Sequence, residues 1–421
     1  MESIVEIGTT YPIGGLKLLV MAILVLYLGE FLTHRFPFLL NNNIPAAVTG
    51  GLLCSSALAL LSHFEIAHLD FELELRNSLL LIFFSTIGLT AKFSALLIGG
   101  RAMILLITVC TLFILFQNVV GILIASLIGQ ETVYGLFVGS ISLVGGHGTA
   151  IAWGEVATED GIRGAAELGV AGATLGLIIG GLIGGPVAGR LIRKKQLSYV
   201  ESDAIGANHS APANQNNSET EPAASKSNPI KHYVSIRDFL GTVLALGLCL
   251  GFGEAVNHYL FSYEIRLPGF LTAMMVGVVI TNITSPLKKD VDPDAINLIG
   301  GVSLHLFLAM SLMSMDLLSL VNSAGLLLTT MVAQTILIIF FATHIVFKMM
   351  GSDYDAAVIT GGFIGMGLGA TPVAIANMTA ISREHGPSMK ALLVVPLVGA
   401  FFIDLVNAVV IELFLRLPFM S

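Results

Sequence analysis

Charged residues are scarce in this chain, and that scarcity decides its broad class. Asp, Glu, Lys and Arg make up 11% of the 421 residues, whereas a soluble domain carries about 25%. Hydrophobic residues make up 55%, and the mean hydropathy is +0.87. These values exclude a soluble globular protein, give no sign of a nucleic-acid partner and indicate a polytopic membrane protein.

Cysteine is also rare, and its placement excludes a further class of site. The three cysteines, Cys54, Cys110 and Cys249, lie within apolar runs. They are typical of small buried residues and indicate neither a disulfide framework nor a thiolate metal centre. We expect no cofactor and no enzyme activity. The first apolar run lacks a basic start and a cleavage signal, so we expect it to be a retained span.

What the chain has is a series of apolar runs of about 20 residues, the length that crosses a hydrocarbon core as a helix. The first half contains runs at 16–34, 44–63, 77–98, 102–128 and 165–192. The second half contains runs at 238–260, 267–284, 296–320, 323–347 and 390–415. The sequence therefore predicts an all-α polytopic membrane protein with two five-helix halves.

Two further apolar stretches, at 134–157 and 352–381, contain too much glycine for an ordinary spanning helix. The first includes SLVGGHGT at 142–149, and the second includes GGFIGMGLGATPVAIANM at 361–378. Each follows the fourth span of its half. We predict that each forms a Gly-rich hairpin loop that re-enters the membrane.

The two halves also match residue by residue. The matched pairs, separated by 217 to 223 residues, are Ile44-Pro45 with Leu267-Pro268, Phe84 with Phe307, Gln117 with Gln334 and Gly146-x-Gly148 with Gly367-x-Gly369. Because each half has an odd number of spans, the second half enters the membrane from the opposite side. The sequence thus predicts an inverted repeat, the architecture of many secondary transporters. Its parts are an N-terminal repeat at 1–195, a flexible linker at 196–233 and a C-terminal repeat at 234–421.

The distribution of Lys and Arg predicts the orientation. Of the 20 such residues, those that lie away from the linker side are Lys17, Arg76, Arg163, Arg266 and Arg416. Since cytoplasmic loops are enriched in these residues, we expect a cytoplasmic linker and two external termini. The first loop then enters from outside and the second from the cytoplasm, and their tips meet near the midplane.

Irregular backbone at this depth must be buried in protein or line water. Glycines let a ligand approach backbone amides, the half-helix N-termini attract carboxylates, and unwound carbonyls can coordinate sodium. The alternative is that the stretches are Gly-rich helices that pack closely against their neighbours.

Several long motifs resemble a known family. GGHGTAIAW at 145–153, GLGATPVAIANM at 367–378 and VVPLVGAFFIDLVNAVVIELFL at 394–415 closely resemble the bacterial sodium/glutamate symporters, the glutamate:sodium symporter family. The resemblance covers both halves and weakens in the linker and at the N-terminal tip. It implies sodium-driven uptake of L-glutamate across the bacterial inner membrane, with periplasmic termini. It also implies a homodimer with two re-entrant loops that works by alternating access.

The candidate site residues lie in the two loops and in the last span. A carboxylate within the apolar FFIDLVNA is costly unless it meets a cation or a partner, so Asp404 is the leading candidate, with Asn407 on the same helix face. Expected sodium ligands are Thr371, Asn377, Asp404 and Asn407. Expected substrate-binding residues are Ser142, Gly145, Gly146, His147, Gly148, Thr149, Gly367, Gly369, Thr371 and Asp404.

Each of these assignments has a structural alternative. Asp404 could pair with a neighbouring helix, the hydroxyls could bond to carbonyls of their own helix, and His147 could be a neutral, satisfied histidine. The amides of Gln117, Asn118 and Gln334 are interpreted mainly as interhelical contacts.

The group that meets the second carboxylate of glutamate is undecided. Either the loop amides bind both carboxylates, or an arginine near a span end, Arg76, Arg101 or Arg163, reaches in. The role of Glu155 is equally open, and Glu167 could be an ion-pair partner or an acid that faces the loop.

Four glycines at four-residue spacing, Gly172, Gly176, Gly180 and Gly184, form a close-packing face. It would hold a moving domain against its neighbour or form a dimer contact. We expect the spans at 16–63 and 238–284 to form a scaffold, against which the segments 77–192 and 296–415 move in an elevator-like transport cycle.

Two other functions compete with sodium-coupled transport. An intramembrane hydrolase is excluded because no G-x-S-G stretch or triad is present. A proton-coupled carboxylate or amino-acid transporter or exchanger of the same architecture, with Asp404 as the titrating group, stays open.

Overall fold

The computed structural model describes residues 10–41, 44–64, 68–197, 235–262, 267–285, 291–315 and 317–418. The first half contains the helices α1 (Gly15–Arg35), α2 (Pro37–Asn41), α3 (Ala46–His63), α4 (Glu74–Thr90), α5 (Ser94–Ile128), α6 (Thr132–Phe137), α7 (Ser140–Leu143), α8 (Gly146–Glu159) and α9 (Ala165–Lys195). Nearly all of the expected linker lies outside the described residues.

The second half contains α10 (Ile236–Phe261), α11 (Gly269–Thr284), α12 (Pro293–Met313), α13 (Leu317–Phe341), the π-helix η2 (Ala342–Val346), α14 (Phe347–Met349), α15 (Tyr354–Leu368), α16 (Thr371–His385), α17 (Met389–Leu397), the π-helix η3 (Val398–Phe402) and α18 (Ile403–Leu415). Two short strands, β1 (Thr10–Ile13) and β2 (His68–Phe71), pair in parallel near the N-terminus.

The prediction of an all-α polytopic membrane protein is confirmed. Within the described part of the chain, six helices are long and apolar enough to cross a membrane: α1, α5 from Gly100, α9, α10, α12 and the α13–α14 segment from Ser323. Side chains such as Leu127, 84% exposed, and Leu244, 65% exposed, leave large apolar groups on the outside of these helices. Such a surface is suited to lipid rather than water.

Local signals explain several helix starts. Asp292, Asp353 and Ser388 each precede a helix, and their side-chain oxygens accept a hydrogen bond from the backbone N–H three residues later at 2.8, 2.7 and 3.1 Å. These N-caps satisfy N–H groups that the first helical turn leaves unpaired.

Two predicted boundaries were wrong. The span expected at 296–320 ends at Met313 in α12, and α13 begins at Leu317 instead of 323. The span expected at 77–98 ends at Thr90 in α4, and residues from Ser94 already belong to α5. Gly100 has a φ of 55° and kinks α5 just before the predicted start of the next span. Only glycine adopts this backbone conformation without strain, so the apolar run continues while the helix direction changes.

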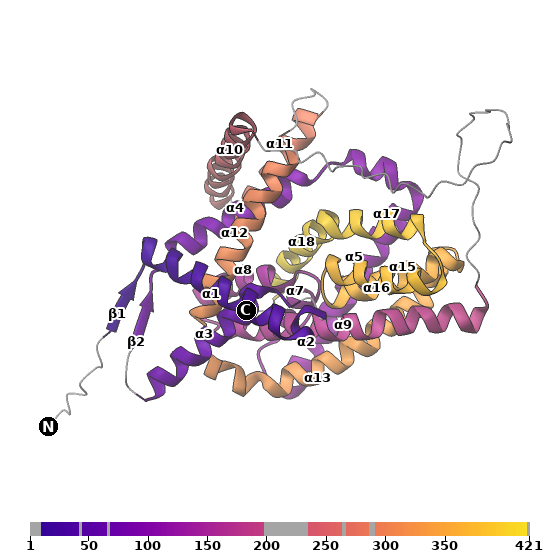
Figure 1. Cartoon of the computed structure of the whole chain (residues 1–421), viewed down its shortest axis with the longest axis horizontal. Helices are drawn as coiled ribbons and strands as arrows, with labels where there is room; N and C mark the ends of the chain where they lie inside the picture. The colour runs from indigo at the N-terminus through magenta and orange to yellow at the C-terminus, as the bar shows by residue number, and fades with distance from the viewer. Residues whose placement is uncertain are drawn as a thin grey trace, which may run out of the picture.

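The helices form two groups, which Figure 1 shows mainly on the left and on the right of the view. The first helix group is α1, α3, α4, α10, α11 and α12, and the second is α5 to α9 with α13 to α18 and the two π-helices. The main contacts between them are those of α12 with α8, α13 with α3 and α4 with η3.

This grouping differs from the expected one, because α4 and α12 pack with α1, α3, α10 and α11 rather than with the Gly-rich stretches. The physical reason is close backbone contact. A Cβ atom on Gly88 of α4 would overlap with the carbonyl oxygen of Met274 in α11, and one on Gly300 of α12 would meet Thr86 of α4.

Candidate functional site

The second Gly-rich stretch forms two helices with a short break. α15 ends at Leu368, Gly369 and Ala370 have extended or irregular backbone, and α16 begins at Thr371 with Pro372 in its first turn. Within α15, a Cβ atom on Gly365 would overlap with the backbone of Ala374 in α16. Glycine in α15 therefore permits close packing of the two helices, and the backbone is unwound only at Gly369 and Ala370.

The first Gly-rich stretch is more irregular. α6 and α7 are separated by Val138 and Gly139, and α7 and α8 by Val144 and Gly145. Gly146 has a φ of 72°, which a residue with a Cβ atom rarely adopts. We call residues 138–146 the first break and residues 368–371 the second break.

Buried amides bind backbone groups of the first break and at the end of α15. Asn118 Oδ1 accepts from the N–H of Ser140 at 2.9 Å, and Asn407 Nδ2 donates to the Ser140 carbonyl at 3.0 Å. Gln117 Nε2 donates to the carbonyl of Gly367 at 3.0 Å, and Gln334 Nε2 donates to the carbonyl of Gln117 at 2.7 Å. These amides thus do more than join helices. Asn118 pairs a backbone N–H at the start of α7, and Gln117 pairs a carbonyl at the end of α15, where the following residues leave the helix. Asn407 adds a further donor to the Ser140 carbonyl, which also accepts from the N–H groups of Val144 and Gly145.

The segment formed by η3 and α18 touches both breaks. The hydroxyl of Thr371 donates to the carbonyl of Gly399 in η3 at 2.8 Å, and Asn407 of α18 holds Ser140 as described above. Asp404 lies between Gly399 and Asn407 on this segment. The structure therefore places Asp404 between the points where the two breaks meet the last span.

Asp404 is half-buried, and none of the described residues forms a hydrogen bond or ion pair with it. A carboxylate in an apolar helix is costly without a partner. Among the described residues, the structure provides no helix-to-helix pair for Asp404.

Three amide oxygens around the breaks also lack partners. Among the described residues, Gln117 Oε1, Gln334 Oε1 and Asn407 Oδ1 are buried and accept no hydrogen bond. Neutral and anionic oxygens are the ligands that hard cations prefer. Gln117 and Gln334 were not expected as ligands. The signal in the sequence that singles them out is their equivalent place in the two matched halves, 217 residues apart.

Most of the polar side chains in the first break and the first turn of α8 form hydrogen bonds within the protein. His147 Nε2 lies 3.0 Å from the hydroxyl of Thr174, which donates to the carbonyl of Val170 at 3.0 Å, so the ring of this buried histidine has a protein partner. Ser142 donates weakly to the carbonyl of Gly139 at 3.4 Å. Thr149 is half-buried and makes no hydrogen bond to another described residue.

The glycine ladder of α9 packs within the chain, against both hairpins. A Cβ atom on Gly172 would meet Ser142 of α7, and one on Gly176 would overlap with the carbonyl oxygen of Leu368 at the end of α15. Asn377 of α16 donates to the carbonyls of Gly180 and Gly361 at 3.0 and 3.3 Å. Its amide nitrogen therefore fixes α16 to α9 and α15.

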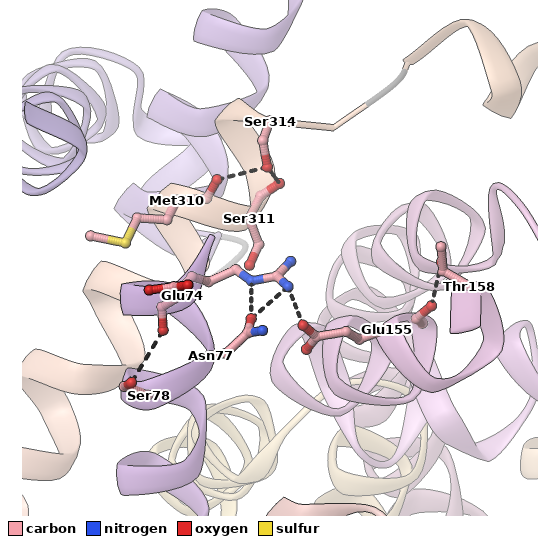
Figure 2. A network of polar contacts seen from close by, with 10 residues as sticks. Glu74, Asn77, Ser78, Glu155, Thr158, Met310, Ser311 and Ser314 are labelled. Atoms are coloured by element: carbon pink, nitrogen blue, oxygen red, sulfur yellow. Dashed lines mark hydrogen bonds and ion pairs between the residues drawn. The ribbon is translucent and has the colours of Figure 1, made fainter. Parts of the chain in front are cut away.

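The three candidate arginines differ in exposure. Arg101 and Arg163 are exposed, whereas the side chain of Arg76 is 12% exposed and forms an ion pair with Glu155 of α8. Figure 2 shows Asn77 and Glu155, the two side chains to which Arg76 donates, between the helices. Arg76 is thus the buried cationic side chain of the three, and it lies outside the two breaks.

Residues 11–387 match the family described as "Sodium/glutamate symporter". The chain is 41% identical over 411 residues to a sodium/glutamate symporter of Escherichia coli (strain K12), covering 97% of this chain and 99% of that protein. It is 37% identical over 406 residues to a sodium/glutamate symporter of Haemophilus influenzae, covering 96% and 97% of the two chains. The aligned region includes both breaks.

Proposed function

The chain belongs to the sodium/glutamate symporter family, and we propose that it imports L-glutamate together with sodium by alternating access. The observation that carries this proposal is the position of Asp404. It is an unpartnered carboxylate between the points where the last span touches the first and the second break. A cation at this position would link the two hairpins to each other.

In this proposal, sodium is held by Asp404 and by neutral oxygens nearby. Asn407 and Thr371 contribute from α18 and α16, and the unpartnered oxygens of Gln117 and Gln334 supplement them. Asn377 is retained as a ligand only through its carbonyl oxygen, because its nitrogen donates to α9 and α15. All of these proposed ligand atoms are oxygens, which sodium prefers to thiolate sulfur and imidazole nitrogen.

L-Glutamate binds beside this cation at the two breaks. The first turns of α8 and α16 present backbone N–H groups and the positive ends of their helix dipoles to its carboxylates. The proposed contacts are Ser142, Gly145, Gly146, Gly148, Thr149, Gly367, Gly369, Thr371 and Asp404. His147 holds α8 to α9 through Thr174 instead of contacting the substrate.

The proposed alternating access is supported by the matched halves of the sequence and by the two helix groups. The corresponding Gln117 and Gln334 are both buried and contact each other's helices, and both Gly-rich stretches form helix pairs with a break. These features support an inverted repeat with two re-entrant hairpins. We propose that the second helix group moves against the first, elevator-like, and that the first group is the scaffold.

The proposed setting is the bacterial inner membrane, with periplasmic termini, a cytoplasmic linker and a homodimeric assembly. The Lys and Arg distribution supports the orientation, and the resemblance to the family supports the dimer. Cysteine labelling from each side of the membrane tests the orientation: labelling of a linker cysteine from the periplasm would contradict it.

The deciding experiment uses the purified chain in proteoliposomes. We expect an imposed sodium gradient to drive uptake of labelled L-glutamate and a proton gradient alone to drive none. Uptake driven by protons without sodium would instead favour the proton-coupled exchanger, with Asp404 as its titrating carboxylate. Absence of uptake under both gradients would contradict the proposal.

A further inference from the structure

A polar cleft of about 460 Å³ lies between the two helix groups, away from both breaks. Arg76 of α4 and Ser311 of α12 line it from the first helix group, and Glu155 of α8 lines it from the second. No residue of the first or second break is among its lining residues. Polar and charged side chains in a largely apolar protein are costly to keep, which makes this cleft a candidate site.

Asn77 and Glu155 fix the orientation of the Arg76 guanidinium, and some of its N–H donors form no hydrogen bond with the described residues. Nε and Nη2 donate to Asn77 Oδ1 at 2.9 and 2.7 Å, and Nη2 also donates to Glu155. A guanidinium has five N–H donors. The two donors on Nη1 have no acceptor among the described residues.

Ser311 supplies an independent sign of a ligand. Its side chain is 6% exposed, and its hydroxyl has no hydrogen-bond partner among the described residues. Figure 2 shows this side chain pointing toward the ion pair. The hydroxyl of Ser314, one turn later, is satisfied by the carbonyls of Met310 and Ser311 at 3.0 and 3.1 Å.

We propose that this cleft is a second binding subsite for the transported acidic amino acid, which it holds before the amino acid reaches the two breaks. The α-carboxylate binds the Nη1 donors of Arg76 and the hydroxyl of Ser311, and the ammonium group binds Glu155. The exposed Arg163, on the rim of the cleft, meets the second carboxylate. The inference rests on the proposed transport of glutamate and adds a step to it.

The cleft contains groups of both signs for a zwitterion: Arg76 and Arg163 line it together with the carboxylates of Glu155, Glu159 and Glu167. The head group of an amino acid carries one charge of each sign, so its binding adds no net charge to this set. The ion pair stays intact, because the carboxylate uses donors that the pair leaves free. A purely structural ion pair would join α4 to α8 equally well but would require neither the free Nη1 donors nor the unpartnered hydroxyl.

The test compares Ser311→Ala with Ser314→Ala, a matched control on the same helix and in the same cleft. Sodium-driven glutamate transport is measured with substrate offered from each side of the membrane, in intact cells and in inside-out vesicles. We expect Ser311→Ala to raise KM about tenfold from the side on which the cleft opens, as for loss of a hydrogen bond to a charged group. Maximal rate, KM from the opposite side and the sodium dependence should stay unchanged.

Arg76→Lys gives a second measurement. Lysine keeps the charge that pairs with Glu155 but lacks the planar fork of donors, so the same one-sided increase in KM is expected. An unchanged KM in Ser311→Ala, an equal increase from both sides, or an equal increase in Ser314→Ala would overturn the subsite. If the unmodified protein transports no glutamate, that result would instead contradict the proposed function itself.

Discussion

The side-chain nitrogen of Asn407 lies 3.0 Å from the carbonyl oxygen of Ser140, and this bond ties the last span to the first break. Both residues are buried, and Asn118 holds the N–H of the same serine. The unwound backbone at Ser140 thus has a protein partner for each of its polar groups. Backbone at membrane depth needs such partners because lipid provides none.

Replacing Asn407 with alanine should destabilise the protein and weaken sodium binding. The mutation removes one hydrogen bond, worth about 0.5–1.5 kcal/mol, while the carbonyl of Ser140 keeps the N–H groups of Val144 and Gly145 at 3.2 and 3.0 Å. Thermal unfolding of the purified protein in detergent, with and without sodium, measures both effects. Val409→Ala, on the exposed side of the same helix, is the control. Equal unfolding temperatures for Asn407→Ala and the unmodified protein would contradict the prediction.

Asp404→Asn should remove most sodium-coupled uptake while the protein still folds. Loss of a charged ligand corresponds to roughly 1.5–3 kcal/mol, so the sodium concentration for half-maximal uptake should rise by at least about tenfold. Initial rates over a range of sodium concentrations measure this change. Glu30→Gln, at an exposed carboxylate on α1, should leave the sodium dependence as it is. An unaltered sodium dependence in Asp404→Asn would remove Asp404 from the site.

The glycine ladder offers a paired test on one helix. A Cβ atom on Gly176 would overlap with the carbonyl oxygen of Leu368, whereas one on Gly185 would meet nothing within 4 Å. Gly176→Ala should therefore destabilise the protein by about 1–3 kcal/mol through overpacking.

For Gly185→Ala we expect little change or a gain of about 0.5–1 kcal/mol, because alanine favours the helix. The temperature at which each variant aggregates in detergent compares the two directly. Similar behaviour of the two variants would show that α9 does not pack against the second break in this way.

His147→Gln should retain most of the glutamate uptake. The ring nitrogen of His147 binds Thr174 of α9 at 3.0 Å, and a glutamine side chain can make a similar hydrogen bond. The KM for glutamate and its dependence on pH between about 6 and 8, where histidine ordinarily titrates, should match those of the unmodified protein. A large rise in KM in a variant that folds normally would return His147 to the substrate site.

Much of the candidate site could be predicted from the sequence, and its main omission has a physical cause. Asp404 was found because a carboxylate in an apolar run is conspicuous, and the breaks were found because glycine and proline interrupt helices. Gln117 and Asn118 were interpreted only as interhelical contacts. An amide in a span looks the same whether it binds a neighbouring helix or an unwound backbone 250 residues away.

The sequence by itself determined the elements of this protein. The hydrophobic effect acts on contiguous apolar runs, so the all-α membrane class, the two interrupted stretches and the positions of the long apolar helices follow from local composition. The tertiary structure decided which helices belong together and what each polar group faces. It placed α4 and α12 with the first helix group, turned the ladder of α9 toward both breaks and set Arg76 against Glu155. Those outcomes depend on close backbone approach between segments far apart in the chain, and no local pattern encodes which segments those are.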